Sequence, residues 1–431
     1  MTQQVLPAAH DSYAALRFPD FRRFIASVVT LTVATQIQAV VVGWQIYAVT
    51  KDPLSLGLVG LAEAVPFIAI ALFAGHVADR TNRRRVVALA TVAMLACAAA
   101  LLAFTLAPAT LARGRVWPVY AVIFASGVAR SFLQPARQAL GAELVPRELY
   151  PNAVAWRSSV WQFAAVVGPA LGGLLYGFGD AAVAYGVDMA LVAVALVAIV
   201  RLGRVPLPSV PIPTAVPAGQ SIGESLVAGI RFVRSEPVLL AALTLDLFSV
   251  FFGGATALLP IFAADILQVG PEGLGVLRAA PSVGAVVMSL VLAHRPPLRR
   301  SGAVLLVNVA LFGLAMIGFG LSRGFVLSTV LLVISGAVDM VSVVIRSTLL
   351  QVSTPPELLG RVSSVNQIFI GSSNEIGAFE SGVAARLLGT VPSVVFGGLM
   401  TLLVVGLTTW KVPELRRLGR LDKLRPELRK R

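Results

Sequence analysis

Charged residues are scarce in this sequence: only 13% of its 431 residues are Asp, Glu, Lys or Arg, whereas 57% are hydrophobic. A soluble domain of this length needs a more polar surface, so the balance excludes an ordinary soluble protein. Apolar stretches of about 20 residues recur along the chain, and an α-helix needs about that length to cross the hydrocarbon core of a bilayer. The composition therefore predicts an all-α, multi-pass membrane protein.

Cysteine and histidine are also rare. The single cysteine, Cys97, excludes an internal disulfide framework. The three histidines are His10, His76 and His294, and they lie too far apart in the sequence to suggest a metal site, so no metal and no cofactor is expected. The chain lacks the GxxxxGK[ST], HExxH and GxSxG motifs, which argues against ATP as an energy source and against an enzyme of these classes.

Hydropathy predicts twelve spans in two groups of six. The first group lies at 25–48, 54–75, 86–107, 117–137, 153–177 and 181–200, and the second at 238–261, 272–293, 303–321, 325–346, 362–385 and 391–410. The predicted organisation is an N-terminal segment (1–24), two six-helix bundles (25–200 and 238–410), a linker between them (201–237) and a basic tail (411–431). The linker begins with a Pro-rich stretch that cannot be helical and continues into a short amphipathic helix.

Positive charge is distributed asymmetrically about these spans. If the N-terminus is cytoplasmic, five of the 35 basic residues lie at the opposite side; these are Lys51, Arg113, Arg115, Arg323 and Arg386. Such a bias follows the positive-inside rule and predicts that both termini are cytoplasmic. The net charge of +14 is then a topology signal that also attracts anionic lipids at the cytoplasmic face. We expect a monomer without a nucleic-acid partner.

The two groups of spans are repeats of each other. The segment SGVAR at 126–130 is matched by SGAVD at 335–339, and the same offset aligns Arg137 with Arg346. A slightly larger offset, reconciled by a loop difference, aligns Gly60 with Gly275 earlier in each half. Two homologous halves related by an axis along the membrane normal are typical of one class of transporter folds.

Arginines deep in the membrane fall opposite acids in this repeat: Arg130 aligns with Asp339, and Arg278 aligns with Glu63. Equivalent helices of the two halves face each other around the central axis, so we expect each pair to meet there. Mutual neutralisation is what buried ions require. Intramembrane ions are functional candidates by default, and the alternative is that these are structural pairs that lock the bundle.

Polar side chains at helical spacing mark the first and fourth spans of each half. We expect these stripes to line a central cavity for a small-molecule substrate, in which Arg130 and Asp339 face each other. The predicted cavity residues are Gln38, Gln45, Arg130, Gln134, Asp246, Ser249, Ser335, Asp339 and Ser342.

Two motifs resemble signatures of the major facilitator superfamily. GHVADRTNRRRVV, between the second and third spans, resembles its cytoplasmic-loop signature, with Asn82 in place of the usual glycine; the matching residues are Gly75, Asp79, Arg80, Arg83 and Arg84. VVGPALGGLLYG, on the fifth span, resembles its antiporter signature, with Ala164 where a further glycine is usual; the matching residues are Gly168, Pro169, Gly172 and Gly173. Small residues at this spacing let helices approach closely.

The segments FPDFRRF, QPARQAL, GRVSSVNQIF and SNEIGAFESG extend the likeness over nearly the whole chain. The sequence is identified as a member of this superfamily and resembles its bacterial exporter branch, which includes the enterobactin exporter and proton-coupled multidrug antiporters. The resemblance implies two pseudo-symmetric six-helix bundles in the bacterial inner membrane. It also implies that the charged loop acts as a cytoplasmic latch, which holds helix ends together in one state.

The implied function is export of a drug-like compound or a siderophore by proton antiport. The embedded acids exceed what two deep arginines neutralise, which favours coupling to protons; the candidates are Asp246, Asp339, Glu63, Glu375 and Glu380. Asp246 or Asp339 is expected to be the main carrier. Asp246 has the advantage that the repeat gives it no arginine partner. The alternatives are a facilitator or importer on the same fold and a substrate sensor that does not transport.

Overall fold

The computed structural model describes residues 11–107, 115–203, 222–296 and 299–420, with the backbone alone at 71–72, 76, 78–80, 222–226 and 368. These described residues form helices and connections without a β-strand. The helices are η1 (Ala14–Arg17), α1 (Pro19–Thr50), α2 (Pro53–Arg80), α3 (Arg83–Leu106), α4 (Trp117–Glu143), η3 (Arg147–Leu149), α5 (Tyr150–Val200), α6 (Ile222–Ser235), α7 (Pro237–Gly253), η4 (Ala255–Leu258), α8 (Leu259–Ile261), η5 (Phe262–Ile266), α9 (Gly270–Ala293), α10 (Ser301–Leu321), α11 (Phe325–Ser353), α12 (Pro356–Leu388), α13 (Thr390–Lys411) and α14 (Pro413–Arg417).

The predicted spans coincide with these helices. Nine helical stretches of the described chain are long and apolar enough to cross a membrane. One of them, Arg147–Val200, contains two of the predicted spans. The helices α4 and α12 are of similar length but more polar, because α4 carries the predicted cavity residues Arg130 and Gln134 and α12 carries the acids Glu375 and Glu380.

The two spans within α5 are separated at Asp180, whose backbone has a non-helical φ of 78°. The Asp180 carboxylate accepts hydrogen bonds from the backbone N–H groups of Ala182 (2.7 Å) and Val183 (3.2 Å), which is how an N-cap residue starts a new helix. The connection between α1 and α2 is equally short. Lys51 ends α1 in a left-handed conformation, and Asp52 caps α2 one residue later.

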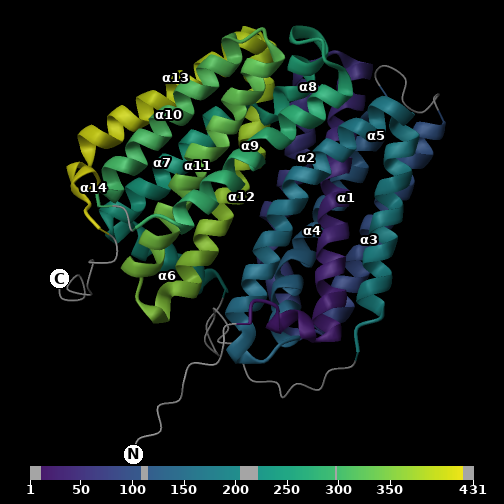
Figure 1. Cartoon of the computed structure of the whole chain (residues 1–431), viewed down its shortest axis with the longest axis horizontal. Helices are drawn as coiled ribbons and strands as arrows, with labels where there is room; N and C mark the ends of the chain where they lie inside the picture. Colours follow the sequence, from purple (N-terminus) through teal and green to yellow (C-terminus); the bar gives the residue numbers. More distant parts are fainter. Residues whose placement is uncertain (1–10, 108–114, 204–221, 297–298, 421–431) are drawn as a thin grey trace, which may run out of the picture.

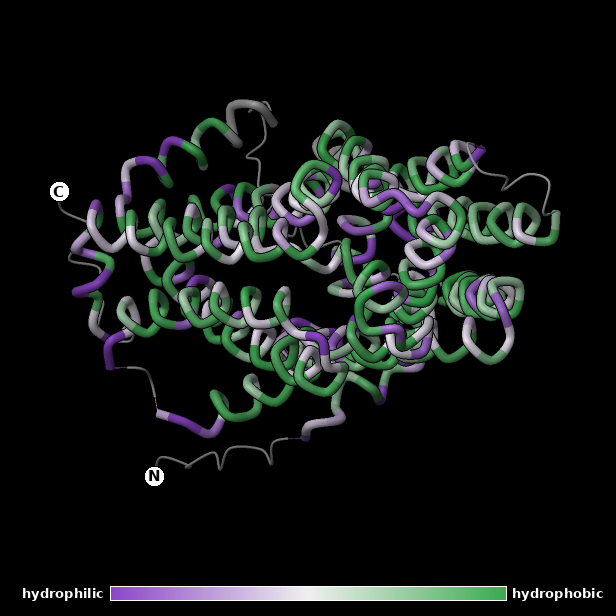
Figure 2. Tube along the Cα trace, turned by 90° about the horizontal axis from the view of Figure 1, so that it is seen from above, coloured by the Kyte–Doolittle hydropathy of each residue, from purple (hydrophilic) through white to green (hydrophobic). Residues whose placement is uncertain are grey.

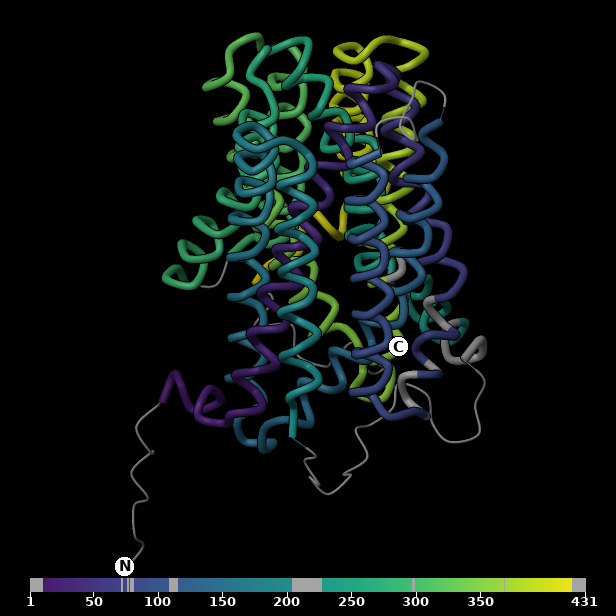
Figure 3. The backbone as a smooth tube through the Cα atoms, turned by 90° about the vertical axis from the view of Figure 1, so that its right-hand side faces the viewer, coloured from purple at the N-terminus to yellow at the C-terminus, as the bar shows by residue number. Residues whose placement is uncertain are grey.

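The helices form two bundles side by side (Figure 1), with α1–α5 in one and α6–α14 in the other. Seen from the side, the long helices run along a common direction (Figure 3). Hydrophilic positions gather where the bundles face each other, and hydrophobic positions dominate the outer helices (Figure 2). The Pro-rich part of the predicted linker lies outside the described residues. The amphipathic helix predicted after it is α6, which contacts α12 where Gly229 approaches the Arg361 backbone.

The bundles contact each other at the end remote from α6, through two crossings of glycine on glycine. A Cβ atom added to Gly57 of α2 would lie 3.1 Å from the Gly382 Cα atom of α12, and one added to Gly173 of α5 would lie 2.8 Å from the Gly275 Cα atom of α9. Only glycine permits such an approach of two helix backbones. The repeat is therefore visible in the packing, since each half contributes one helix to each crossing.

Apolar packing and ion pairs join the halves at this same end. One hydrophobic cluster includes Val40 and Ile46 of α1 together with Leu258, Phe262 and Leu274 of the second bundle, whereas the clusters toward the α6 end each belong to a single bundle. Two ion pairs also cross between the bundles; they are Lys51–Asp265 at 3.6 Å and Asp52–Arg386 at 3.7 Å. The molecule is thus closed at the remote end.

Candidate functional site

A cavity of about 550 Å³ lies between the bundles, on the α6 side of the glycine crossings. Its lining comes from α1, α2, α3, α4 and α5 of the first bundle and from η4, α8, α9 and α12 of the second. The polar and charged residues in the lining are Thr32, Thr35, Gln36, Gln38, Glu63, Ser126, Arg130, Gln134, Arg137, Thr256, Arg278, Asn374 and Glu375. Gln38, Ser126, Arg130 and Gln134 belong to the predicted polar stripes.

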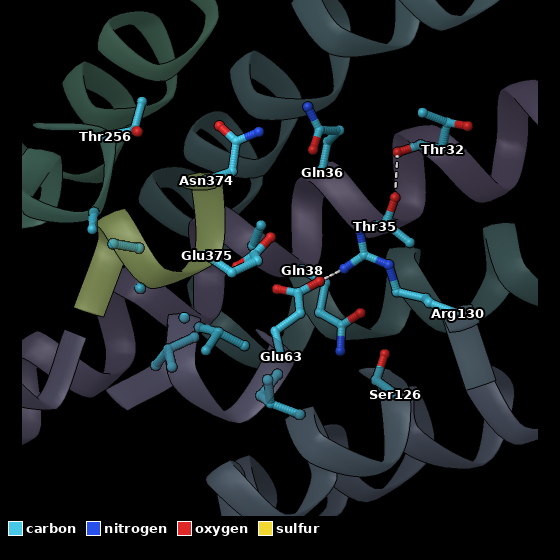
Figure 4. Close-up of a pocket in the computed structure, with 18 of the residues that line it drawn as sticks. Thr32, Thr35, Gln36, Gln38, Glu63, Ser126, Arg130, Thr256, Asn374 and Glu375 are labelled. Atoms are coloured by element: carbon cyan, nitrogen blue, oxygen red, sulfur yellow. Dashed lines mark hydrogen bonds and ion pairs between the residues drawn. The ribbon is translucent and has the colours of Figure 1, made fainter. Parts of the chain in front are cut away.

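Arg130 forms an ion pair with Glu63 of the same bundle (Figure 4). The pair forms because α4 and α2 pack closely: a Cβ atom on Gly127 would lie 2.7 Å from the Pro66 ring. The Ser131 hydroxyl also donates to the Pro66 carbonyl across 3.4 Å. The structure therefore corrects both expected pairings, of Arg130 with Asp339 and of Glu63 with Arg278. An ion pair needs contact distance, and helices adjacent in one bundle provide it.

Arg278 and Glu375 bring charge to the same cavity from the second bundle. The Arg278 guanidinium donates a hydrogen bond to the Ala39 carbonyl of α1 (3.4 Å), and it makes no ion pair within the described chain. Glu375 projects from α12 toward the Glu63–Arg130 pair (Figure 4), and its charge interacts with those of Arg130 and Arg278. Acids and arginines from both halves thus meet in one cavity, although not in the pairs that the repeat predicted.

A second cavity, of about 270 Å³, lies within the second bundle. It contains the remaining predicted residues of the polar stripes, which are Asp246, Ser249, Ser335, Asp339 and Ser342. Asp339 makes no hydrogen bond and no ion pair in the described part of the chain, and it does not share a cavity with Arg130. Thr256 and Asn374 line both cavities, so the two adjoin.

Asp246 forms an ion pair with Arg346 of α11, and both side chains are buried, at 9% and 7% exposure. This corrects the expectation that Asp246 lacks an arginine partner. The span predicted from hydropathy, 325–346, ends at Arg346 and so placed this residue at a membrane boundary. Its spacing of seven residues from Asp339, however, continues the polar stripe of that helix. That stripe was the signal that Arg346 points inward.

Two predicted residues lie outside both cavities. Gln45 donates to the Thr105 hydroxyl (3.1 Å) and accepts from the Tyr185 hydroxyl (3.0 Å), inside the first bundle. Its position is near the closed end, where the cavity no longer extends. Glu380 lies on α12 beyond the lining residues. A buried acid that the polar stripes missed is Asp188 of α5, whose two carboxylate oxygens have no hydrogen-bond partner within the described ranges.

The charged loop between α2 and α3 is only partly described, since the side chains of Asp79 and Arg80 lie outside the described residues. Arg83 forms an ion pair with Glu143 at the end of α4, and Arg84 donates to the Val200 carbonyl at the end of α5. Gly75 has open space where a Cβ atom would be. The described arginines therefore join the α6-side ends of three helices of one bundle.

The glycines of the antiporter signature sit at helix contacts of α5. Added Cβ atoms would lie 2.5 Å from Gln36 Cβ at Gly168 and 3.1 Å from Ile37 Cα at Gly172, so both contact α1. Gly173 contacts α9 of the other bundle. Pro169 also lies at this contact, because its carbonyl oxygen would be 2.7 Å from a Cβ atom added to Gly275 of α9. The motif thus serves packing within and between the halves.

We expect the Glu63–Arg130 pair to show energetic coupling. Removing one partner leaves the other charge without compensation in a site of reduced dielectric constant, whereas removing both does not. Glu63→Gln and Arg130→Gln should each lower the thermal stability of the purified protein, and the double variant should lose less than their sum, by about 1 kcal/mol because both side chains are partly solvated. Additive losses in this double-mutant cycle would show that the pair is not coupled.

The two repeated bundles around a polar intramembrane cavity define a secondary transporter of the major facilitator superfamily. The chain belongs to the transmembrane secretion effector family, whose sequence profile matches residues 10–425. It is 28% identical over 403 residues to the enterobactin exporter of Shigella flexneri, with 93% of each chain covered. It is also 28% identical over 405 residues to the enterobactin exporter of Escherichia coli O157:H7, again with 93% of each chain covered.

Solved structures with the same fold include two transporters of low sequence identity. A bacterial homolog of the human lysosomal transporter Spinster, in an inward-facing and unoccupied conformation, has a TM-score of 0.67 at 14% identity, over 92% of this chain and 98% of that one. The D-xylose–proton symporter has a TM-score of 0.69 at 13% identity, over 93% and 100%. The predicted superfamily and exporter branch are confirmed, and the protein is a multi-pass protein of the bacterial cell membrane.

Proposed function

We propose that this protein is a proton-coupled antiporter that exports a small organic molecule, drug-like or siderophore, by alternating access. The observation that carries the proposal is Asp339, a carboxylate that has no partner among the described residues and lies in a cavity that adjoins the central one. A carboxylate in a site of low dielectric constant takes up a proton readily, and its affinity for that proton changes with its surroundings. The likeness to an enterobactin exporter over 93% of each chain supports the direction of transport.

Asp339 becomes the leading candidate for the proton carrier, ahead of Asp246. An arginine at contact distance stabilises the ionised form of a carboxylate, and Asp246 has such a partner in Arg346. The ionised form of Glu63 is stabilised by its ion pair with Arg130 in the same way, and the charge of Glu375 interacts favourably with two arginines. Glu380 lies outside both cavities, so these three rank lower.

The cytoplasmic side is assigned by the positive-inside bias to the end that carries α6. The bundles touch at the opposite end, so the arrangement corresponds to an inward-facing state in which the central cavity is reached from the cytoplasm. Export then requires the glycine crossings to separate. The arginines of the charged loop are proposed to act as the latch of the outward-facing state, and their contacts with Glu143 and Val200 hold three helix ends as one unit.

The proposal is tested by expressing the chain in a bacterial strain that lacks its own drug and siderophore exporters. Efflux of ethidium and of enterobactin is measured with and without a protonophore. We expect efflux against the concentration gradient that collapses when the protonophore dissipates the proton gradient. An importer would instead increase accumulation, a facilitator would be insensitive to the protonophore, and a sensor would change neither flux. Each of these three results would contradict the proposal.

A further inference from the structure

The charges that line the central cavity do not balance. Three arginines and two glutamates line it, which gives a formal charge of +1. Glu63 is committed to Arg130, and the remaining carboxylate, that of Glu375, interacts with Arg130 and Arg278. The charges of Arg137 and Arg278 are therefore opposed by a single carboxylate. A net charge inside a membrane protein is costly unless a counter-charge reaches it, and the cavity is where a counter-charge has room.

Within the part of the chain that the structure describes, neither of these two arginines has all of its guanidinium N–H groups bonded. A guanidinium carries five N–H donors, but Arg278 makes a single hydrogen bond of 3.4 Å to the Ala39 carbonyl. Arg137 makes a single hydrogen bond of 3.0 Å to the Gln134 side chain. Arg137 also lies within the electrostatic reach of Arg130 and Arg157, which repel it. Several donors of both groups are therefore free to bind an acceptor in the cavity.

Uncharged donors in the same lining also lack partners. Among the described residues, the side-chain nitrogen of Gln38, in a residue only 9% exposed, has no hydrogen-bond partner, and neither has the hydroxyl of Thr32. An amide nitrogen can only donate, so the group that satisfies Gln38 has to be an acceptor. Buried polar groups of this kind are normally paired. Both residues line the cavity, so a rotation of either side chain would let it donate to an oxygen acceptor of a bound ligand.

We infer that the central cavity selects organic oxyanions, meaning molecules with a carboxylate or phenolate group on an apolar body, over organic cations of the same size. Guanidinium groups bind such groups through paired, charge-assisted hydrogen bonds. The apolar body is accommodated by Leu31, Ile123 and Trp161, which also line the cavity. This inference names a substrate class and rests on the proposed transport function.

The smaller cavity has the opposite character. Asp246 is neutralised by Arg346, and Asp339 remains as an acid that no described residue pairs with, so an anion is disfavoured there while a proton is favoured. The two cavities share Thr256 and Asn374. The anion site and the proton site thus adjoin without sharing a charged residue.

The test uses two dyes with the same xanthene framework and opposite charge: fluorescein, a dianion at mildly alkaline pH, and rhodamine 123, a cation. Binding to the purified full-length protein in nanodiscs of zwitterionic lipid is measured by fluorescence anisotropy. We expect fluorescein to bind about tenfold more tightly than rhodamine 123, since one charge-assisted contact is worth at least that ratio. Arg278→Gln and Arg137→Gln should each remove about tenfold of the fluorescein affinity and leave that of rhodamine 123 unchanged or higher.

Two further variants serve as controls. Arg278→Lys keeps the charge and should retain part of the preference for fluorescein. This result would show that the loss in Arg278→Gln comes from the missing charge and not from misfolding. Arg323→Gln removes the same charge from an exposed position at the start of α11, outside the cavity, and should change nothing. Equal or tighter binding of rhodamine 123, unchanged affinities in both glutamine variants, or no binding of either dye would overturn the inference. Uphill, protonophore-sensitive export without an anion preference would leave the proposed function standing and remove only the substrate class.

Discussion

Asp339→Asn is expected to abolish uphill, protonophore-sensitive efflux while substrate binding and substrate exchange persist. The amide has nearly the shape of the carboxylic acid but cannot release or take up a proton at physiological pH. Transport then loses its coupling to the proton gradient, whereas the central cavity, to which Asp339 does not contribute, is unaltered. The measurement compares net efflux with counterflow exchange in proteoliposomes, with and without an imposed pH gradient.

Asp246→Asn is the matched comparison, because it removes an acid from the same cavity. This change leaves Arg346 buried without a counter-charge, and breaking a buried pair in this way costs about 3–5 kcal/mol. We expect a lower yield of folded protein, restored by Asp246→Asn combined with Arg346→Gln. If Asp339→Asn keeps protonophore-sensitive uphill efflux, Asp339 is not the carrier, and if both single variants keep it, neither acid is.

The helices and their order could be predicted from the sequence because the signals are local. Runs of about 20 apolar residues require helices in a bilayer, and short signals such as Lys51-Asp52-Pro53 place a boundary to within a residue or two. The repeat correctly identified helices whose polar faces turn inward. Gln38 and Arg130 of one half line the central cavity as expected. Asp339 of the other half lines the second cavity instead, so the expectation that it faces Arg130 in a common cavity is wrong.

The pairing of charges could not be predicted in the same way. The repeat relates positions by a symmetry axis, but an ion pair depends on which side chains come within contact distance in one conformation. Arg137 and Arg346 illustrate the limit. They are equivalent in the repeat, yet Arg346 meets Asp246, whereas the corresponding region of α1 offers only glutamines, and Arg137 bonds to Gln134. The two halves therefore share the arrangement of their helices but differ in whether an acidic residue lies within contact distance of the equivalent arginine.

Gly173→Ala is expected to shift the protein toward the outward-facing state and to slow transport. A Cβ atom at this position would lie 2.5 Å from the Pro271 carbonyl oxygen and 2.8 Å from the Gly275 Cα atom. Both are backbone atoms of α9, so they cannot move aside as a flexible side chain does. Overpacking of this kind costs about 1–3 kcal/mol, and the cost falls only on the conformation in which α5 and α9 touch. The population of the closed crossing should drop by about tenfold or more.

The shift is measured by labelling from the two sides of the membrane. Cys97 is the only cysteine of the chain and is buried, so Cys97→Ser gives a background in which Thr35→Cys adds one thiol to the central cavity. An impermeant maleimide should label this thiol from the cytoplasmic side in the parent and increasingly from the outside in the Gly173→Ala variant. Gly186→Ala is the matched control in the second span of α5, after Asp180, where an added Cβ atom meets nothing within 4 Å. Unchanged labelling in the Gly173→Ala variant would mean that the crossing does not form the outer closure, because a methyl group between two backbones at that distance cannot be accommodated without separating them.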